Sequence, residues 1–323
     1  MVVSVVLQEG GAALAVGLFS SVGAIGAVFA RFSGAALMLA LAVRPRVRGL
    51  SAAQWTAVGI LAVSLTVMNF CFYQAISRAP LGLVVTVEIL GPLALSVVTG
   101  HRWTAWLWAA LSLAGVGAIG SSRWGGDTDS LGFLFAIIAA ASWAGYILSA
   151  GRAAKLFAPL DALTLATCIG AIALLPAAAM TVDLHGALQT TTIGLGLVVA
   201  LMCSVIPYSL ELTSLRTLPS STFAVLTSLS PVIAAISGWL VLHQHMSTMD
   251  WAGILCVTGA SIGAVKYGRT AVADIDALPI SLPAESAVAS PDHGLSHGSL
   301  LEHDDSTPAG RDRRTCAMSP GGR

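Results

Sequence analysis

Long apolar runs separated by short polar stretches make up the chain from Met1 to Tyr267. A helix needs about 20 apolar residues to cross a bilayer, and these runs have about that length. Taking charged, Gly- and Pro-containing stretches as breaks, the pattern predicts ten membrane-spanning helices and hence an all-α membrane protein. The expected ranges are approximately 2–20, 26–43, 54–76, 81–99, 104–120, 131–150, 161–180, 192–214, 221–241 and 250–267.

The positively charged residues predict how these helices are oriented. With the N-terminus in the cytoplasm, nine Lys and Arg residues fall on cytoplasmic connections or at the start of the tail, against two outside. Such an excess of cytoplasmic positive charge is typical of membrane proteins. We therefore expect an inner-membrane protein with both termini in the cytoplasm. The nine are Arg44, Arg46, Arg48, Arg102, Arg152, Lys155, Arg216, Lys266 and Arg269, and the two are Arg78 and Arg123.

One pair of prolines occurs twice in the chain. Pro80 and Pro92 have the same spacing as Pro219 and Pro231, so a single sequence offset relates both members of the first pair to those of the second. With five expected helices per half, the second copy would cross the bilayer in the opposite direction to the first. Inverted repeats of this kind are common in secondary transporters, which bind substrate near the midplane between the repeats.

The chain therefore divides into a transporter domain and a tail. The domain is expected over residues 1–267, as two inverted five-helix repeats of about 1–125 and 126–267 around a central cavity. Residues 268–323 are rich in Ser, Pro, Gly, Ala and charged residues and show no sustained periodicity. Such a segment buries too little apolar area to offset its ordering entropy, so a disordered cytoplasmic tail is expected.

Composition agrees with a membrane protein and excludes several classes of function. The chain is 56% hydrophobic and 10% charged, whereas globular domains carry roughly 25% charged residues. A net charge of zero gives no basic patch for nucleic acid. Four cysteines lie in apolar runs without metal-ligand spacing, which favours packing roles, and no metal or cofactor is expected. Neither HExxH nor a GxGD-like pair of membrane aspartates occurs, which argues against an intramembrane enzyme.

Two prolines and an acid mark candidate functional positions within the expected helices. Pro92 and Pro231 lack the N–H that would bond the carbonyl four residues earlier, and those carbonyls belong to Glu88 and Thr227. An acidic residue at the centre of a spanning helix costs on the order of 2.5–3.5 kcal/mol and normally faces a polar interior. Glu88 is therefore either a functional group at a cavity, which could take up a proton, or a hydrogen-bonded structural acid.

Other polar residues inside the expected helices are less specific. For Arg31 a structural ion pair with a carboxylate is the favoured interpretation. Glu9 is in mid-helix, whereas Glu211 is near the cytoplasmic end of its helix and could be solvated there. Two pairs share a helix face, namely Asn69 with Tyr73 and Trp143 with Tyr146. Such pairs also occur in ordinary bundle cores, and Trp143 either packs in the bundle or lines a substrate cavity.

Five segments carry a resemblance to a known family. The chain resembles EamA-type members of the drug/metabolite transporter superfamily over residues 4–267, and is most similar to the threonine/homoserine exporter group. The resemblance implies ten helices in two inverted repeats around a central cavity, and proton-driven export of small amino acids or related metabolites. The segments are "QEGGAALAVGLF", "MNFCFYQAI", "APLGLVVTVEILGPLA", "SWAGYILSAGRA" and "IPYSLELTSLRTLPSSTF".

The resemblance also implies a set of site residues. Two positions depart from the family: Gln244 stands where many relatives carry an acid, and Ser230 stands where similar proteins often have Glu. Neither departure changes the expected fold. By matching position, the residues expected near the cavity are Glu9, Asn69, Tyr73, Glu88, Trp143, Tyr146, Tyr208 and Glu211.

The sequence thus predicts a secondary transporter that exports threonine- or homoserine-like amino acids by alternating access, with proton coupling. The alternative is a carrier that exports or imports another small metabolite or a drug. A channel is disfavoured because the expected helices lack rings of charge. The expected partners are a small-molecule substrate, protons and the lipid bilayer, and the oligomeric state is open between a monomer and a homodimer.

Overall fold

The structure, a computed structural model, describes residues 1–100, 103–123, 129–158, 160–210 and 226–267. Regular structure within these residues is entirely helical. The helices are α1 (Val2–Val16), α2 (Phe19–Val43), α3 (Ala52–Ile76), α4 (Leu81–Glu88), α5 (Leu90–Gly100), α6 (Trp103–Arg123), α7 (Ser130–Leu156), α8 (Asp161–Thr181), α9 (Leu184–Ala187), α10 (Thr190–Ala200), the π-helix η1 (Leu201–Val205), α13 (Ser230–Leu242) and α14 (Thr248–Tyr267).

The all-helical class predicted from the sequence is confirmed for the described residues. Helices α3 and α8 begin and end within two residues of the expected 54–76 and 161–180. Helix α2 begins earlier than expected but bends at Gly23, whose φ of 68° favours glycine. Five helices have the length and apolar composition to cross a membrane. They are α2, α3, α7, α8 and the helical stretch Thr190–Leu210, so ten crossing helices stay a prediction.

Apolar side chains cover much of the described surface, while several charged side chains are buried. Leu41, Val63, Leu113, Ile172 and Met180 are all exposed on helices. Lipid is the solvent in which such a surface is stable, because hydrocarbon does not penalise exposed apolar groups. The chain is therefore a multi-pass membrane protein.

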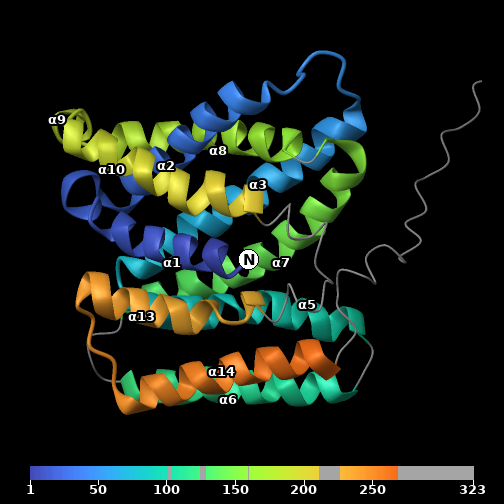
Figure 1. Ribbon diagram of the computed structural model, residues 1–323, viewed down its shortest axis with the longest axis vertical. Helices are drawn as coiled ribbons and strands as arrows, with labels where there is room; N and C mark the ends of the chain where they lie inside the picture. The colour runs from blue at the N-terminus through green and yellow to red at the C-terminus, as the bar shows by residue number, and fades with distance from the viewer. Residues whose placement is uncertain (101–102, 124–128, 159, 211–225, 268–323) are drawn as a thin grey trace, which may run out of the picture. The chain divides into compact units, whose positions relative to one another are not determined.

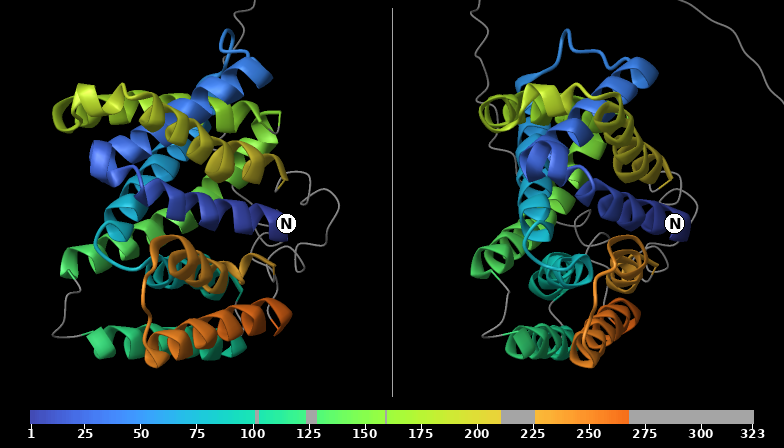
Figure 2. Two further views of the ribbon diagram at one scale, coloured as in Figure 1. Left: turned by 60° about the vertical axis from the view of Figure 1, so that its left-hand side comes forward. Right: turned by 90° about the vertical axis from the view of Figure 1, so that its left-hand side faces the viewer.

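The helices of residues 1–267 pack as successive layers (Figure 1). Helices α6 and α14 lie side by side at one edge in both figures (Figure 2). The next layer contains α13 and α4, which pack on each other, and α5. Helix α1 packs on α13, and α7 packs on α3, α4 and α5. On the other side α2 contacts α8 and α10, while α3 contacts α8.

The chain is interrupted close to both prolines of the predicted repeat. Helix α4 ends at Glu88 and α5 begins at Leu90, two residues before Pro92. Helix α13 begins at Ser230, immediately before Pro231. A proline near the start of a helix costs little, because its missing N–H would lack an intrahelical partner there.

Gln244 stabilises the start of α4. Its side-chain Oε1 accepts a hydrogen bond from the Leu81 backbone N–H at 3.1 Å. The backbone N–H of Gln244 is itself bonded to the Gly238 carbonyl at 3.1 Å. The first N–H groups of a helix have no partner within the helix, so an oxygen from a neighbouring segment fills that role. The neutral amide at this departure from the family pattern thus has a structural function in this chain.

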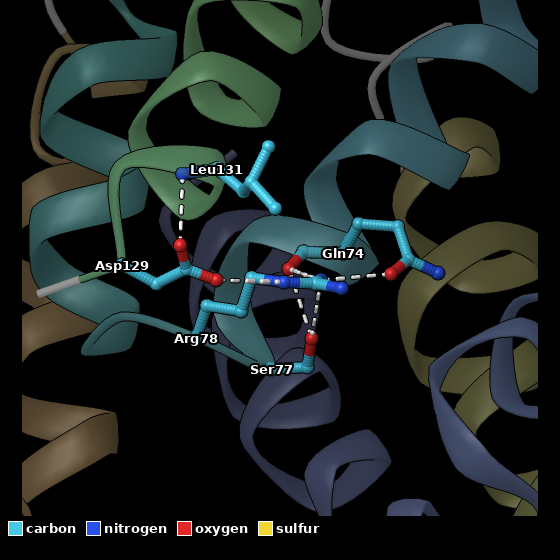
Figure 3. Close-up of polar contacts among 5 residues, drawn as sticks. All are labelled: Gln74, Ser77, Arg78, Asp129 and Leu131. Carbon is cyan, nitrogen blue, oxygen red and sulfur yellow. Dashed lines mark hydrogen bonds and ion pairs between the residues drawn. The ribbon is translucent and has the colours of Figure 1, made fainter.

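An ion pair joins the end of α3 to the start of α7 (Figure 3). The Arg78 Nε lies 3.2 Å from Asp129 Oδ2, while Asp129 Oδ1 accepts from the Leu131 N–H and so caps α7. The guanidinium also donates to Gln74 Oε1 at 2.8 Å and to Ser77 Oγ at 3.1 Å. Both partners are partly exposed, so the pair contributes about 0–1 kcal/mol and its main effect is to hold the two helix ends together.

The closest approach of helices around the α4–α5 interruption occurs at Gly91. A Cβ atom on Gly91 would collide with the carbonyl oxygen and carbonyl carbon of Ala140 in α7. Glycine is therefore required for α5 to pack against α7 at this depth. By contrast, a Cβ on Gly59 in α3 would have no heavy atom within 4 Å.

We predict that Gly91→Ala destabilises the protein and that Gly59→Ala does not. Overpacking of this kind costs about 1–3 kcal/mol, whereas Ala replaces Gly in a helix with a gain of up to about 1 kcal/mol. The measurement is the thermal unfolding midpoint of the purified protein in detergent. Equal midpoints for the two variants would contradict the close contact between Gly91 and Ala140.

Candidate binding site

Four ionisable or strongly polar side chains are buried where α1, α2, α3 and α4 meet the rest of the bundle. The exposed fractions are 6% for Glu9, 4% for Arg31, 3% for Asn69 and 9% for Glu88. Burying a charge is costly unless other groups stabilise it. Their surroundings therefore decide what this part of the protein can bind.

Arg31 is held by a backbone carbonyl that a proline has left without a helical partner. The carbonyl of Cys203 would normally bond the N–H four residues later, but that residue is Pro207, which has none. Here the chain forms the π-helix η1, a wider turn that frequently occurs at functional sites. The Nη2 of Arg31 donates to the Cys203 oxygen at 2.9 Å, and its Nε donates to Ser204 Oγ at 3.1 Å.

The sequence favoured a structural ion pair between Arg31 and a carboxylate. Among the described residues Arg31 forms no such pair, so that expectation was wrong for them. Glu9 and Glu88 are within electrostatic reach of the guanidinium and of each other. Neither carboxylate, however, forms an ion pair or a hydrogen bond with it. Instead, the guanidinium carbon lies 5.9 Å from the centre of the Tyr73 ring. Arg31 thus takes neutral partners and leaves both acids unpaired with it.

A narrow cavity lies beside the guanidinium. It is a crevice between closely packed side chains, too tight in this conformation to admit a water molecule. Polar groups from α2, α3, α8 and the segment after α10 share its walls with apolar side chains. The lining residues are Arg31, Phe32, Ala35, Leu65, Asn69, Thr167, Ser204 and Tyr208.

The residues expected at the site separate into three groups. Asn69 and Tyr208 line the cavity, while Glu9, Glu88 and Tyr73 are buried around the Arg31 guanidinium. Trp143 and Tyr146 are partly buried and pack against the main apolar core, away from the walls of this cavity. Glu211 lies outside the described residues.

Sequence reasoning did not identify Cys203, Ser204 and Thr167, although each contributes to the site. Thr167 is a cavity wall residue whose hydroxyl bonds to carbonyls of its own helix. For Cys203 a signal was present, because Pro207 follows it by four residues, the spacing that led from Pro92 to Glu88. Among the described residues no cluster of three or more His, Cys, Asp or Glu side chains is placed to hold a metal ion.

Helix α1 approaches η1 closely at Gly11. A Cβ there would lie 2.5 Å from Cys203 Sγ and 3.0 Å from Met202 Cβ. The Cys203 thiol lies 3.5 Å from the Gln8 carbonyl oxygen, and Ser4 Oγ donates to the Pro207 carbonyl at 3.3 Å. These contacts set α1, and with it Glu9, against the turn that holds Arg31.

The apolar surface and the buried polar side chains are the features of a membrane protein with a polar interior. The EamA-like transporter family model matches residues 130–265. The threonine/homoserine exporter RhtA of Escherichia coli K12 is 32% identical over 272 residues, covering 83% of this chain and 91% of the relative. The chain belongs to the EamA-like transporter family, in the drug/metabolite transporter superfamily, and is therefore a membrane transporter of small metabolites.

Further relatives agree with this assignment. The threonine/homoserine exporter RhtA of Salmonella typhimurium LT2 is 32% identical over 259 residues, covering 79% of this chain and 86% of the relative. The uncharacterized transporter YwfM of Bacillus subtilis 168 is 26% identical over 238 residues, covering 72% and 80%. A solved structure titled "Crystal structure of protein" has a TM-score of 0.53 at 20% identity, covering 82% of this chain and 94% of that one, so it supports the fold alone.

The neighbouring glycines of α1 provide a test of the contact between α1 and η1. We predict that Gly11→Ala lowers transport activity and thermal stability, because the new methyl group would push α1 away from Cys203. Gly10→Ala is the matched control, since its Cβ would come no closer than 4.0 Å to Met202 Cε. Cys203→Ala removes the Sγ atom and should partly rescue Gly11→Ala. The absence of any difference between Gly10→Ala and Gly11→Ala would contradict the contact.

Proposed function

We propose that this protein exports small amino acids of the threonine and homoserine kind, or related metabolites, from the cytoplasm by proton-coupled alternating access. The observation that carries the proposal is a buried site that combines a basic side chain with two acidic ones. Arg31 supplies the basic group, while Glu9 and Glu88 supply carboxyl groups within its electrostatic reach. A zwitterionic amino acid carries the complementary charges. The names of the two RhtA relatives support the same class of substrate.

The lining of the cavity favours a polar substrate. Asn69, Thr167 and Ser204 give its walls hydrogen-bonding groups, which a purely apolar drug would leave unpaired. Export of a small polar metabolite therefore fits these walls better than export of an apolar compound.

The packing of the helices supports two inverted repeats of about 1–125 and 126–267. If the two halves are repeats, α1 is equivalent to α7, and α13 is equivalent to α4 and α5 together. Helix α10 with η1 is then equivalent to α3. Helix α1 packs on α13 and η1, and α7 correspondingly packs on α4–α5 and α3. The contact between α2 and α10 is then equivalent to the contact between α8 and α3. The contacts α2–α8, α4–α13 and α6–α14 each join two equivalent helices, so exchanging the halves leaves them unchanged.

The cavity wall supports the same symmetry. Leu65 and Ser204 both line the cavity, as do Asn69 and Tyr208. Each of these pairs has the same separation in sequence as Pro80 and Pro219, the offset that relates the two proline pairs. Equivalent positions of two repeats would meet in this way at a central axis, near the midplane where secondary transporters bind substrate.

In the proposed cycle the two halves rock about the interrupted segments at Glu88–Leu90 and before Pro231. The inward-facing cavity accepts substrate, the outward-facing one releases it, and proton uptake at Glu88 accompanies the return. In the proposed topology ten spans would put both termini in the cytoplasm of an inner-membrane protein, and the expected tail of residues 268–323 lies outside the described residues. A carrier for another small metabolite or a drug, working in either direction, is the alternative function.

Counterflow into proteoliposomes tests the substrate class. Vesicles containing the purified protein are loaded with one unlabelled compound and then given labelled L-threonine outside. We expect internal L-threonine or L-homoserine to drive uptake of label, because alternating access exchanges substrates of the same site. Internal drugs and sugars should not do so. Counterflow with those compounds alone would favour the alternative cargo.

Replacing Glu88 tests proton coupling. We expect Glu88→Gln to lose transport driven by an imposed pH gradient while it retains counterflow, since exchange requires no net proton movement. Asp129→Asn is the control, because it neutralises a carboxylate outside the cavity and Asn still caps a helix well. Unchanged pH dependence in the Glu88→Gln protein would remove Glu88 from the coupling mechanism.

A further inference from the structure

The Arg31 guanidinium uses only one of its edges to bind the protein. The Nε–H and one N–H of Nη2 lie on the same side of the planar group, and these bond to Ser204 Oγ and the Cys203 carbonyl. The end of the group, formed by Nη1 and the second N–H of Nη2, makes no hydrogen bond of good geometry to a described residue, although the guanidinium also has a weaker contact with the Tyr73 hydroxyl. That end is the fork whose two N–H groups match the two oxygens of a carboxylate.

A second buried polar group lies close to the guanidinium. The Tyr73 hydroxyl is completely buried and interacts with Arg31 through a weak side-chain hydrogen bond. No described residue forms a hydrogen bond of good geometry with it. A buried hydroxyl that is poorly hydrogen-bonded is destabilising, so its presence in a packed bundle calls for an explanation.

The charges around Arg31 are also incomplete without a ligand. Glu9 and Glu88 lie near the guanidinium but do not pair with it directly. A buried cation separated from its countercharges loses hydration without gaining a close ion pair. A molecule carrying a carboxylate for Arg31 and an ammonium for the acids would satisfy all three groups.

We propose that Arg31 and the Tyr73 hydroxyl bind the substrate's carboxylate, and that this contact makes the transport site specific for carboxylate-bearing metabolites. The inference rests on the proposed function, in that the site is a transport site. It goes beyond that function by assigning the carboxylate to α2 and α3. The side edge of Arg31 fixes the guanidinium against η1, so that its free end is already oriented for two parallel hydrogen bonds.

A purely structural role for Arg31 would explain the bonds to Cys203 and Ser204 only. It leaves unexplained why the guanidinium lies near a buried hydroxyl that has no partner of good geometry. It also does not explain why Arg31 forms part of the wall of the cavity. These three features share one requirement, which is an anion with two acceptor oxygens.

Binding of matched carboxylates and carboxamides provides the test. The probes are L-threonine and L-threoninamide, together with 3-hydroxybutyrate and 3-hydroxybutyramide, which lack the amino group. Dissociation constants are measured by ligand-induced thermal stabilisation of the full chain in detergent. We expect the wild type to bind each carboxylate at least about 30-fold more tightly than its amide, because truncating one partner of a buried charge pair has effects of this size.

Three variants separate binding from folding. Arg31→Met should lose the preference for carboxylates while keeping its affinity for the amides. Tyr73→Phe should lower carboxylate affinity by about 10-fold, with little loss of thermal stability, because the hydroxyl has no partner of good geometry to lose. Ser149→Ala is the control, since it removes a buried hydroxyl that bonds to a carbonyl of its own helix α7 and does not line the cavity. It should therefore retain the preference.

The outcomes distinguish this proposal from the function on which it rests. If the wild type does not prefer carboxylates, or if Tyr73→Phe and Ser149→Ala retain the preference equally, the assignment is overturned. Arg31-dependent binding of 3-hydroxybutyrate without counterflow of threonine or homoserine would leave the carboxylate site standing and reject the proposed cargo. An Arg31→Met protein that does not fold leaves the Tyr73→Phe comparison to decide.

Discussion

The hydrogen bond from Arg31 to the Cys203 carbonyl connects the backbone irregularity at η1 with the buried charge of the candidate site. Pro207 cannot supply the N–H that this carbonyl would receive in a regular helix. Within a bilayer no bulk water replaces it, so another part of the protein must donate. Arg31 does so at 2.9 Å from a neighbouring helix, and thereby brings a positive charge into the interior. Once that charge is buried, nearby polar groups are needed to stabilise it, and they form the site.

Close helix packing keeps these groups in place. The hydrophobic effect does not draw helices together in lipid, so association depends on van der Waals contact and interhelical hydrogen bonds. Gly11 lets α1 approach η1, and Gly91 lets α5 approach α7. The first contact positions Glu9 beside the turn that binds Arg31, and the second supports the interruption after Glu88. The same small residues that allow packing therefore determine the distances between the buried charges.

The sequence allowed the helices to be located well because spanning length and apolar composition are local properties. Glu9, Asn69, Tyr73 and Glu88 could be singled out because a polar residue is costly inside an apolar run, whereas Tyr208 came from the family resemblance. The same reasoning also singled out Trp143 and Tyr146, which do not line the cavity. The partner of Arg31 could not be predicted in this way. It depends on how α2 is rotated against η1 and on the wider π-helical turn, both of which are set by tertiary packing. The freed carbonyl itself was readable from Pro207.

Unlike side chains occupy the cavity positions that the proposed repeat would make equivalent. Under the sequence offset that relates the proline pairs, Leu65 would correspond to Ser204, and Asn69 to Tyr208. If the two halves are repeats that exchange roles during transport, similar backbones would keep the inward- and outward-facing states close in energy. A ligand, however, shifts such an equilibrium only through different contacts in the two states. The different side chain at each member of these pairs, together with the cation Arg31, would provide that difference.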